Sequence, residues 1–226
     1  MTSAIDAFSR QSELFEPSEY GQVRVHVFGL GTIGSFTAFC LAKMGIRLLE
    51  LYDFDMVELH NVSNQFYGVA DVGRLKTAAL SDRIAEAAPD AGEVVVHSCV
   101  VTDATALDIR RHDYVILAVD NFEGRSIIFD KARAVPGVNV IDGRMSGEFF
   151  RVFSFNTLDR ERVDKFADSL NPAATMDDPC GQRSISYNAF AVASVIAAQV
   201  KKMAKSEPYP YEVDFSLRNY SSVVED

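Results

Sequence analysis

The sequence predicts an α/β protein with a Rossmann-like, doubly wound and mainly parallel sheet, to which antiparallel strands are added in the C-terminal half. Three observations support this fold class. Apolar strand patterns alternate with helical patterns from Val23 to Gly143 without a linker. The first of these units contains Gly29-x-Gly31-x-x-Gly34 between a strand and a helix. From Glu148 the alternation stops, and an apolar segment follows the previous strand after only a short turn at Ser146-Gly147, as antiparallel strands do.

Composition limits the class of protein. The 226 residues carry 22 Lys and Arg against 32 Asp and Glu, which gives a formal net charge of −10. Because a phosphate backbone requires clustered cations, this charge argues against binding to nucleic acid or to an anionic membrane. There is no apolar run of about 18 residues and no leader-like N-terminus, so we expect a soluble cytoplasmic protein.

The cysteines and histidines do not form a metal or disulfide pattern. Cys40, Cys99 and Cys180 lie far apart and form no Cys-x-x-Cys pair, which argues against a disulfide framework and a cysteine zinc site. Cys40 and Cys99 fall within apolar helix and strand patterns, so we expect both in the core. The four histidines are scattered, so we expect no histidine metal cluster.

The first elements predict a nucleotide site. Residues 1–20 predict an arm or one short helix, and residues 21–226 a single nucleotide-binding domain. Within the strand, turn, helix and strand of residues 23–53, the three glycines have separate roles. Gly29 permits the tight turn, Gly31 lets a phosphate approach the backbone, and Gly34 lets helix and strand pack closely. Asp53, at the tip of the second strand, is placed to hold ribose hydroxyls.

The remaining elements follow in order. The polar segment from Asp53 to Gly73 must lie at the carboxyl ends of the strands, where open α/β sheets bind ligands. After it, the pattern predicts a helix at 74–88, a strand at 94–101, a short helix at 103–111, a strand at 114–119, a helix at 122–134 and a strand at 138–143. The C-terminal part predicts an antiparallel strand at 148–155, a long loop at 156–183, a buried helix at 184–204 and an edge strand within 209–220.

Four polar residues should meet beside the glycine turn. Asp53 and Asp55 follow the second strand, Lys76 opens the next helix and Asp120 ends another strand. Such a set suits ATP chemistry, because one carboxylate can hold ribose, the lysine can offset phosphate charge and a carboxylate can hold Mg²⁺. The alternative is that these are ordinary strand-end residues and a solvated lysine at a helix terminus.

Taken together, five segments resemble the ThiF, MoeB and ubiquitin-activating superfamily over roughly residues 8–204. They are Gly29-Leu30-Gly31-Thr32-Ile33-Gly34, Asp53-Phe54-Asp55-Met56-Val57-Glu58, Asn61-Val62-Ser63-Asn64-Gln65, Asp71-Val72-Gly73-Arg74-Leu75-Lys76, and Asp120-Asn121 with Arg125. The resemblance implies an enzyme that uses ATP and Mg²⁺ to adenylate the C-terminal carboxylate of a protein or peptide, with release of pyrophosphate.

The resemblance also implies roles for single residues. Asp53 is similar to the ribose ligand, Lys76 to the phosphate-contacting lysine and Asp120 to the magnesium-binding aspartate. Asn61 matches the loop asparagine beside the phosphates. The other residues that we assign to the ATP site are Gly29, Gly31, Gly34, Asp55, Asn64, Gln65 and Asn121.

Two further catalytic candidates rest on the same resemblance. Arg10, in Ser9-Arg10-Gln11, resembles an arginine that such proteins lend across a homodimer interface, where a guanidinium stabilises charge on the α-phosphate. The alternative is a solvated arginine on an arm. Cys180 resembles a cysteine on which some relatives form a thioester or acyl disulfide, and a thiolate near an arginine can attack an acyl-adenylate. Other relatives only adenylate.

One position departs from the family pattern. The usual Asn-x-x-Arg-Gln is here Asn61-x-x-Asn64-Gln65. Because an amide carries no charge, the missing cation must be replaced or the phosphate site is weaker. We hypothesise that Arg144 or Arg183 replaces it, since the first follows a strand end and the second adjoins the long loop.

We therefore expect adenylation of a ubiquitin-like protein, a sulfur-carrier protein or a peptide, with a downstream conjugating partner receiving the acyl group. The chain lacks a Gly-Gly terminus and room for the extra domains of the large eukaryotic enzymes, which favours a small bacterial or phage activating enzyme. Two alternatives remain. A non-catalytic partner subunit is favoured by Asn64. An NAD-dependent oxidoreductase shares the glycine motif, but no Tyr-x-x-x-Lys or catalytic histidine stands in a suitable place.

Overall fold

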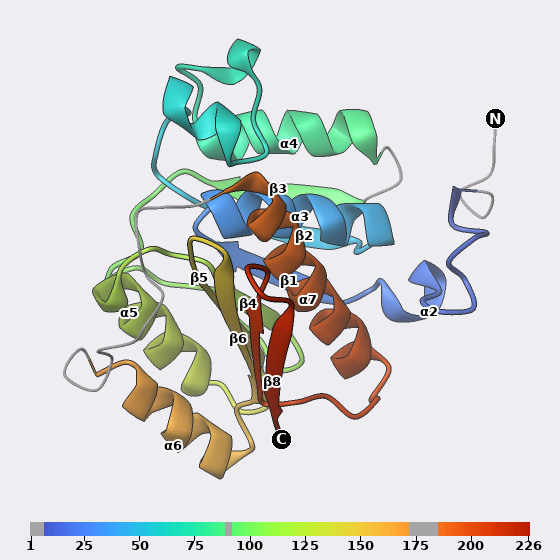
Figure 1. The fold of residues 1–226 in the computed structure, drawn as a ribbon, viewed down its shortest axis with the longest axis vertical. Helices are drawn as coiled ribbons and strands as arrows, with labels where there is room; N and C mark the ends of the chain where they lie inside the picture. The colour runs from blue at the N-terminus through green and yellow to red at the C-terminus, as the bar shows by residue number, and fades with distance from the viewer. Residues whose placement is uncertain (1–6, 89–91, 172–184) are drawn as a thin grey trace.

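The computed structural model describes residues 7–88, 92–171 and 185–226. Its centre is one eight-stranded sheet in the order β3-β2-β1-β4-β5-β6-β7-β8 (Figure 1). Strands β1 to β5 pair in parallel and β6 to β8 pair antiparallel, so the predicted fold class is confirmed. The strands are β1 (Arg24–Phe28), β2 (Leu48–Tyr52), β3 (Glu93–His97), β4 (Tyr114–Leu117), β5 (Asn139–Ser146), β6 (Phe149–Asn156), β7 (Glu212–Ser216) and β8 (Ser221–Glu225).

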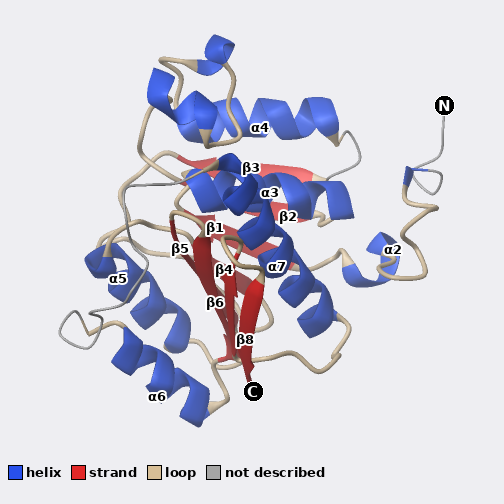
Figure 2. Ribbon diagram, viewed as in Figure 1, coloured by secondary structure: helices blue, strands red, loops and turns tan. Residues whose placement is uncertain are grey.

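Helices cover both faces of the sheet (Figure 2). The larger core lies under α3, α4 and α7, and the second core lies under α5 and α6. Of the helices in the described ranges, none combines the length and apolar character of a membrane span. The helices are α2 (Pro17–Tyr20), α3 (Thr32–Met44), α4 (Lys76–Ala87), α5 (Phe122–Arg133), α6 (Arg160–Ser169) and α7 (Ser186–Ala204), with the 3₁₀ helices η1 (Leu59–Ser63) and η2 (Val69–Asp71).

The predicted helix at 103–111 is wrong, because that segment crosses from β3 to β4 without helical structure. Its apolar residues Leu107 and Ile109 alternate with polar ones and pack against the second core, which is the spacing of an extended chain. Arg24 also holds the segment in place, since its Nη1 donates to the backbone oxygen of Asp108 at 2.8 Å. Part of the sheet face near β2 and β3 is therefore covered by extended chain.

The predicted loop at 156–183 is also wrong in its first half, where α6 forms. Asp159 caps this helix by accepting a hydrogen bond from the Arg162 amide, and the helix buries Val163 and Phe166 in the second core. Most residues of α6 are polar or charged, so its narrow apolar stripe was not recognised as a helix signal. Residues 172–184 lie outside the described ranges, and so do the candidates Cys180 and Arg183.

The strand predictions at the two edges of the sheet also need correction. The strand expected at 94–101 ends at His97, which is level with the last residue of its neighbour β2, Tyr52. Within the described residues, β2 offers no further strand backbone for residues 98–101 to pair with. The single expected C-terminal edge strand is two strands, because β7 pairs with β6 and β8 then forms the edge.

Candidate functional site

A cleft of about 1250 Å³ lies at the carboxyl ends of the parallel strands, and residues from distant segments line it. This is the edge at which open α/β sheets bind ligands. Most of the sequence-predicted site residues meet here: Gly29, Gly31, Asp53, Asp55, Asn61, Asn64, Gln65, Lys76, Asp120, Asn121 and Arg144. Gly34 does not line the cleft, and neither does the exposed Arg10.

The glycine turn shapes one wall of the cleft. Gly29 has a φ of +85°, and a Cβ on it would lie 2.7 Å from the Ala118 carbonyl oxygen. A Cβ on Gly34 would lie 1.8 Å from the Gly29 carbonyl oxygen, so Gly34 allows the helix to approach the strand. At Gly31 the nearest atom to such a Cβ is 3.9 Å away, at Gln65 Nε2, so space is available beside this backbone.

The start of α3 suits an anion. Gly31 is its N-cap, no side chain caps it, and no acidic residue stands in its first turn. The dipole of a 13-residue helix places partial positive charge at this end, beside the cleft.

Asp53 is fixed at the tip of β2 next to the glycine turn. Its Oδ2 accepts from the Leu30 amide at 2.7 Å, and its Oδ1 accepts from the Asp55 amide at 2.8 Å. Burial raises the pKa of this carboxyl, although Lys76 and the two amides act against that rise. The side chain therefore has a defined orientation before any ligand binds.

Lys76 is held at the cleft by Asp55. Its Nζ lies 2.8 Å from Asp55 Oδ2, and its amide donates to the Asp55 carbonyl oxygen at 3.0 Å. Lys76 is only 6% exposed, whereas the Asp55 side chain is about half exposed, at 49%. The pair thus places one ammonium group beside the cleft, with its counter-charge on the solvent side.

The loop from η1 contributes amides. Asn61 Oδ1 accepts from the Glu58 amide at 2.8 Å, and the Asn61 carbonyl oxygen accepts from the amides of Asn64 and Gln65. Gln65 Oε1 is buried and has no hydrogen-bond partner among the described residues. A buried polar atom in this condition is costly, and a ligand or water in the cleft would satisfy it.

Asp120 and Asn121 connect β4 to α5. Asn121 Oδ1 caps α5 by accepting from the Gly124 amide at 2.7 Å, and its Nδ2 donates to Asp120 Oδ1 at 3.2 Å. Asp120 is exposed at the cleft. Among the described residues no group of three or more His, Cys, Asp and Glu side chains could hold a metal ion. A divalent cation at Asp120 would therefore need further oxygen ligands from its substrate or from water.

The two buried arginines share a partner, Asp142, that was not predicted from the sequence. Arg125 and Arg144 are each 1% exposed, and both donate to the fully buried Asp142. Arg144 also donates to the Ser169 hydroxyl at 3.0 Å and lies over the rings of Phe122, Phe153 and Phe166. The sequence contained one signal, the carboxylate of Asp142 directly after the apolar residues Val140 and Ile141 in a predicted strand. Asp142 is therefore a counter-charge that the two arginines share.

The expectation that Cys99 lies in the core is wrong. Cys99 is exposed and lines the cleft, because β3 ends at His97 and the chain then turns along the sheet edge. Cys40 is partly buried within α3, and that burial raises the pKa of its thiol. Other residues that line this part of the cleft and that sequence analysis did not select are Phe28, Tyr52, Val100, Val101 and Thr102.

Comparison with known proteins agrees with the fold and the motifs. The chain belongs to the ThiF family, whose sequence profile matches residues 14–222. It is 34% identical over 111 residues to the probable adenylyltransferase/sulfurtransferase MoeZ of Mycobacterium tuberculosis, which covers 48% of this chain and 28% of MoeZ. It is 33% identical over 126 residues to the ubiquitin-like modifier-activating enzyme 5 of Caenorhabditis elegans, which covers 49% of this chain and 30% of that enzyme. The chain thus spans less than a third of the length of these curated relatives.

Solved structures share the fold over nearly the whole chain. Escherichia coli MccB, solved with ATP, matches with a TM-score of 0.77 at 17% identity and covers 98% of this chain and 71% of MccB. The structure of PaaA matches with a TM-score of 0.74 at 23% identity, over 100% of this chain and 74% of PaaA. At these identities the likeness establishes the architecture.

Proposed function

We propose that this protein binds MgATP in the cleft and adenylates the C-terminal carboxylate of a ubiquitin-like protein, a sulfur-carrier protein or a peptide. One observation carries the proposal. Asp53, Lys76 and Asp120, from three different segments, line the same cleft as the uncapped start of α3. Family membership supports ATP over the alternative of NAD, and MccB of the same fold was solved with ATP.

The chain's own residues fit a nucleotide. The open space at Gly31 admits a phosphate to the backbone, and the α3 dipole and Lys76 offset its charge. Asp53 is oriented to accept hydrogen bonds from ribose hydroxyls. Gln65 Oε1 supplies a buried acceptor that has no partner among the described residues.

In the proposed reaction, an oxygen of the substrate carboxylate attacks the α-phosphorus of ATP. A new C(=O)O–P bond forms, the bond from the α-phosphorus to the bridging oxygen breaks, and pyrophosphate leaves with that electron pair. No proton has to move, because the carboxylate is ionised at neutral pH. The protein's contribution is therefore positioning and charge neutralisation by Lys76 and the helix start.

Asp120 is the residue that would hold Mg²⁺ in this scheme, because it is an exposed carboxylate at the cleft. When bound, the ion neutralises phosphate charge and so favours departure of pyrophosphate. The exposed position of Asp120 leaves room for the phosphate and water oxygens that would complete the coordination.

Asn64 stands where the family has an arginine and so supplies no positive charge. Within the described residues, Arg144 is our candidate for the cation that replaces it. Arg144 lines the cleft and its guanidinium bonds Asp142 and Ser169, so we propose that it offsets phosphate charge from this fixed position. Arg10 is exposed and does not line the cleft of its own chain, as expected of a residue lent to the partner of a homodimer. A role for Cys180 as acyl acceptor, before transfer to a conjugating partner, is a further part of the proposal.

Isothermal titration with MgATP and with NAD⁺ tests the cofactor, and exchange of labelled pyrophosphate into ATP then tests the chemistry. Exchange is measured with candidate carriers, namely small proteins with a terminal glycine encoded by neighbouring genes. We expect ATP binding, carrier-dependent exchange, and loss of exchange in Asp120→Ala but not in the matched surface variant Asp130→Ala. Exchange that survives Asp120→Ala would refute the assigned role of Asp120. ATP binding without exchange for any carrier would favour the non-catalytic partner subunit.

A further inference from the structure

Three aromatic side chains form a row across the carboxyl ends of β1, β2 and β3. Phe28, Tyr52 and His97 are direct neighbours in the strand register. The Phe28 and Tyr52 rings stack at 4.3 Å with 19° between their planes, and the Tyr52 and His97 rings stack at 4.2 Å with 7° between theirs. Phe28 and Tyr52 line the cleft, whereas His97 does not.

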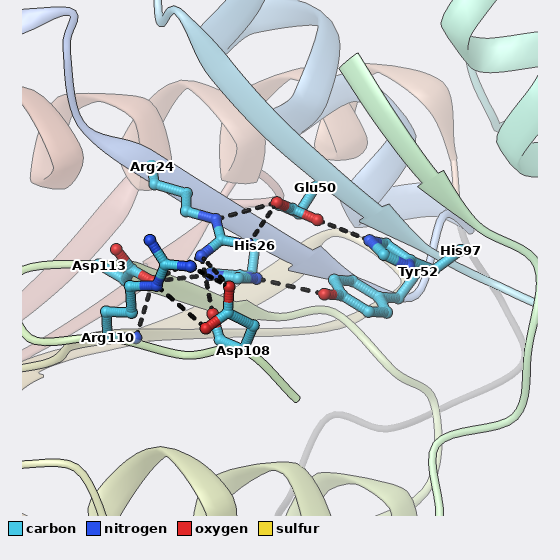
Figure 3. A network of polar contacts seen from close by, with 8 residues as sticks. All are labelled: Arg24, His26, Glu50, Tyr52, His97, Asp108, Arg110 and Asp113. Carbon is cyan, nitrogen blue, oxygen red and sulfur yellow. Dashed lines mark hydrogen bonds and ion pairs between the residues drawn. The ribbon is translucent and has the colours of Figure 1, made fainter. Parts of the chain in front are cut away.

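His97 is held in place by Glu50, which is in turn held by Arg24 (Figure 3). His97 Nε2 lies 2.6 Å from Glu50 Oε2, and the other oxygen of Glu50 accepts from Arg24 Nε at 2.9 Å and Nη2 at 2.6 Å. Glu50 is 4% exposed. Burial acts to raise the pKa of Glu50, but the hydrogen bonds from His97 and Arg24 outweigh it, and the pKa is lowered. The carboxylate is thus a fixed, charged anchor for the His97 ring.

The Tyr52 ring is held at its far end as well. Its hydroxyl lies 3.4 Å from His26 Nδ1, and His26 Nε2 lies 2.9 Å from Asp113 Oδ2. His26 is fully buried, and the Arg110 amide also donates to Asp113 at 2.9 Å. Both faces and the hydroxyl of Tyr52 therefore have partners, and little freedom remains for the ring.

Within the described residues, the chain that runs beside the network is a crossover segment and not a helix. The crossover at 101–111 is extended, and Asp108 on it accepts from Arg24 Nη1 at 3.2 Å. A helix packed on this face would need an apolar sheet surface beneath it, such as the apolar side chains of β4 that α5 covers. The polar network lies on this face of the sheet, and Tyr52 connects it to the wall of the cleft.

From this geometry we propose that His97, held by Glu50 and Arg24, is a positioning residue for the Phe28–Tyr52 wall, and that this wall receives the nucleobase of ATP. The inference rests on the proposed function. Asp53 directly follows Tyr52, so a ribose held by Asp53 places its base close to this wall and to Val100 and Val101. Because His97 and Phe28 already cover the faces of Tyr52, the ring edges face the base, which favours edge-to-face contact.

The test separates the base from the phosphates by using two probes, AMP and inorganic tripolyphosphate. Binding of each is measured by calorimetry to the full chain and to His97→Ala, His97→Phe and the control Val96→Ala. Val96 is a half-exposed neighbour on the same strand, and it points to the opposite side of the sheet. We expect His97→Ala to weaken AMP binding about tenfold, a difference that such titrations resolve readily. Tripolyphosphate binding should stay within about twofold, since its contacts lie at the other end of the cleft.

His97→Phe keeps a ring for the stack and should retain more AMP affinity than His97→Ala, which a purely structural role would not require. If His97→Ala does not fold, Glu50→Gln replaces it, with the same selective loss of AMP binding expected. Equal weakening of both probes, or no weakening of either, overturns the positioning role while the proposed function stands. A wild-type chain that binds neither probe overturns the proposed function and this inference with it.

Discussion

The ammonium of Lys76 lies 2.8 Å from the carboxylate of Asp55, 21 positions earlier in the chain. The backbone repeats this link, because the Lys76 amide donates to the Asp55 carbonyl oxygen. Asp55 thus sets the position of the Lys76 ammonium group, which we predict to contact the phosphates. The two residues form one unit at the start of α4.

Replacing Lys76 tests this unit. Lys76→Ala removes the charge that offsets the phosphates, and we expect pyrophosphate exchange to fall at least about 100-fold. Asp55→Asn keeps the lysine but loosens its position, so a smaller fall of about 10-fold is expected. Lys43→Ala is the matched control, since Lys43 is exposed and donates to the Ala87 carbonyl oxygen at the surface. An unchanged rate in Lys76→Ala would remove the lysine from the mechanism.

Two glycines of the same motif should respond differently to alanine. Gly31→Ala meets no atom closer than 3.9 Å, so we expect a loss of no more than about 1 kcal/mol in unfolding free energy but a strong loss of ATP binding. Gly34→Ala places its Cβ against the Gly29 carbonyl oxygen, so a destabilisation of about 3 kcal/mol is expected. Urea unfolding and ATP titration of both variants check this. Normal ATP binding by a folded Gly31→Ala would contradict the phosphate site.

The opening unit was predictable because its signals are local. The glycine spacing, the strand ends and Asp53 fix the turn and place one wall of the cleft within 31 residues, from 23 to 53. The structures of the crossover at 101–111 and of α6 could not be predicted from the sequence, because they depend on contacts with distant residues. Arg24 holds the crossover in place through the Asp108 carbonyl oxygen, and the second core buries the narrow apolar face of α6.

Removing the charge of Asp142 should destabilise the fold strongly. Asp142→Asn leaves Arg125 and Arg144 buried without their shared counter-charge, and we expect a loss of about 3 to 5 kcal/mol in unfolding free energy. The control Asp130→Asn affects an exposed pair with Arg133 and should cost less than about 1 kcal/mol. Chemical denaturation measures both. Equal stability of the two variants would mean that the buried group carries no such charge balance.

The Glu50 network predicts a dependence of stability on pH. Because the folded state lowers the pKa of Glu50 below its ordinary value of 4.5, its contribution is fully present above that value and is lost as pH falls through the folded pKa. The difference in unfolding free energy between the wild type and Glu50→Gln should therefore be largest near neutral pH and shrink below about pH 4. Urea titrations at several pH values measure it, with Glu86→Gln as an exposed control. A difference that grows on acidification would contradict this sign.

The site was predictable only where residue type and position carried the chemistry. Asp53, Lys76 and Asp120 could be selected because each charged group follows or opens an element at the ligand-binding edge of the sheet. Tyr52 and His97 could not, since their importance comes from stacking across three strands that are distant in sequence. Cys99 was misplaced because the end of β3 depends on where its neighbour β2 ends.

A crystal structure of the protein with a non-hydrolysable ATP analogue and Mg²⁺ would show where the triphosphate and the ion bind. We predict the triphosphate at the start of α3 beside Gly31, with Lys76 Nζ within hydrogen-bond distance of a phosphate oxygen and the ion on Asp120. An analogue bound away from this cleft, or with its phosphates remote from both Lys76 and Asp120, would contradict the account.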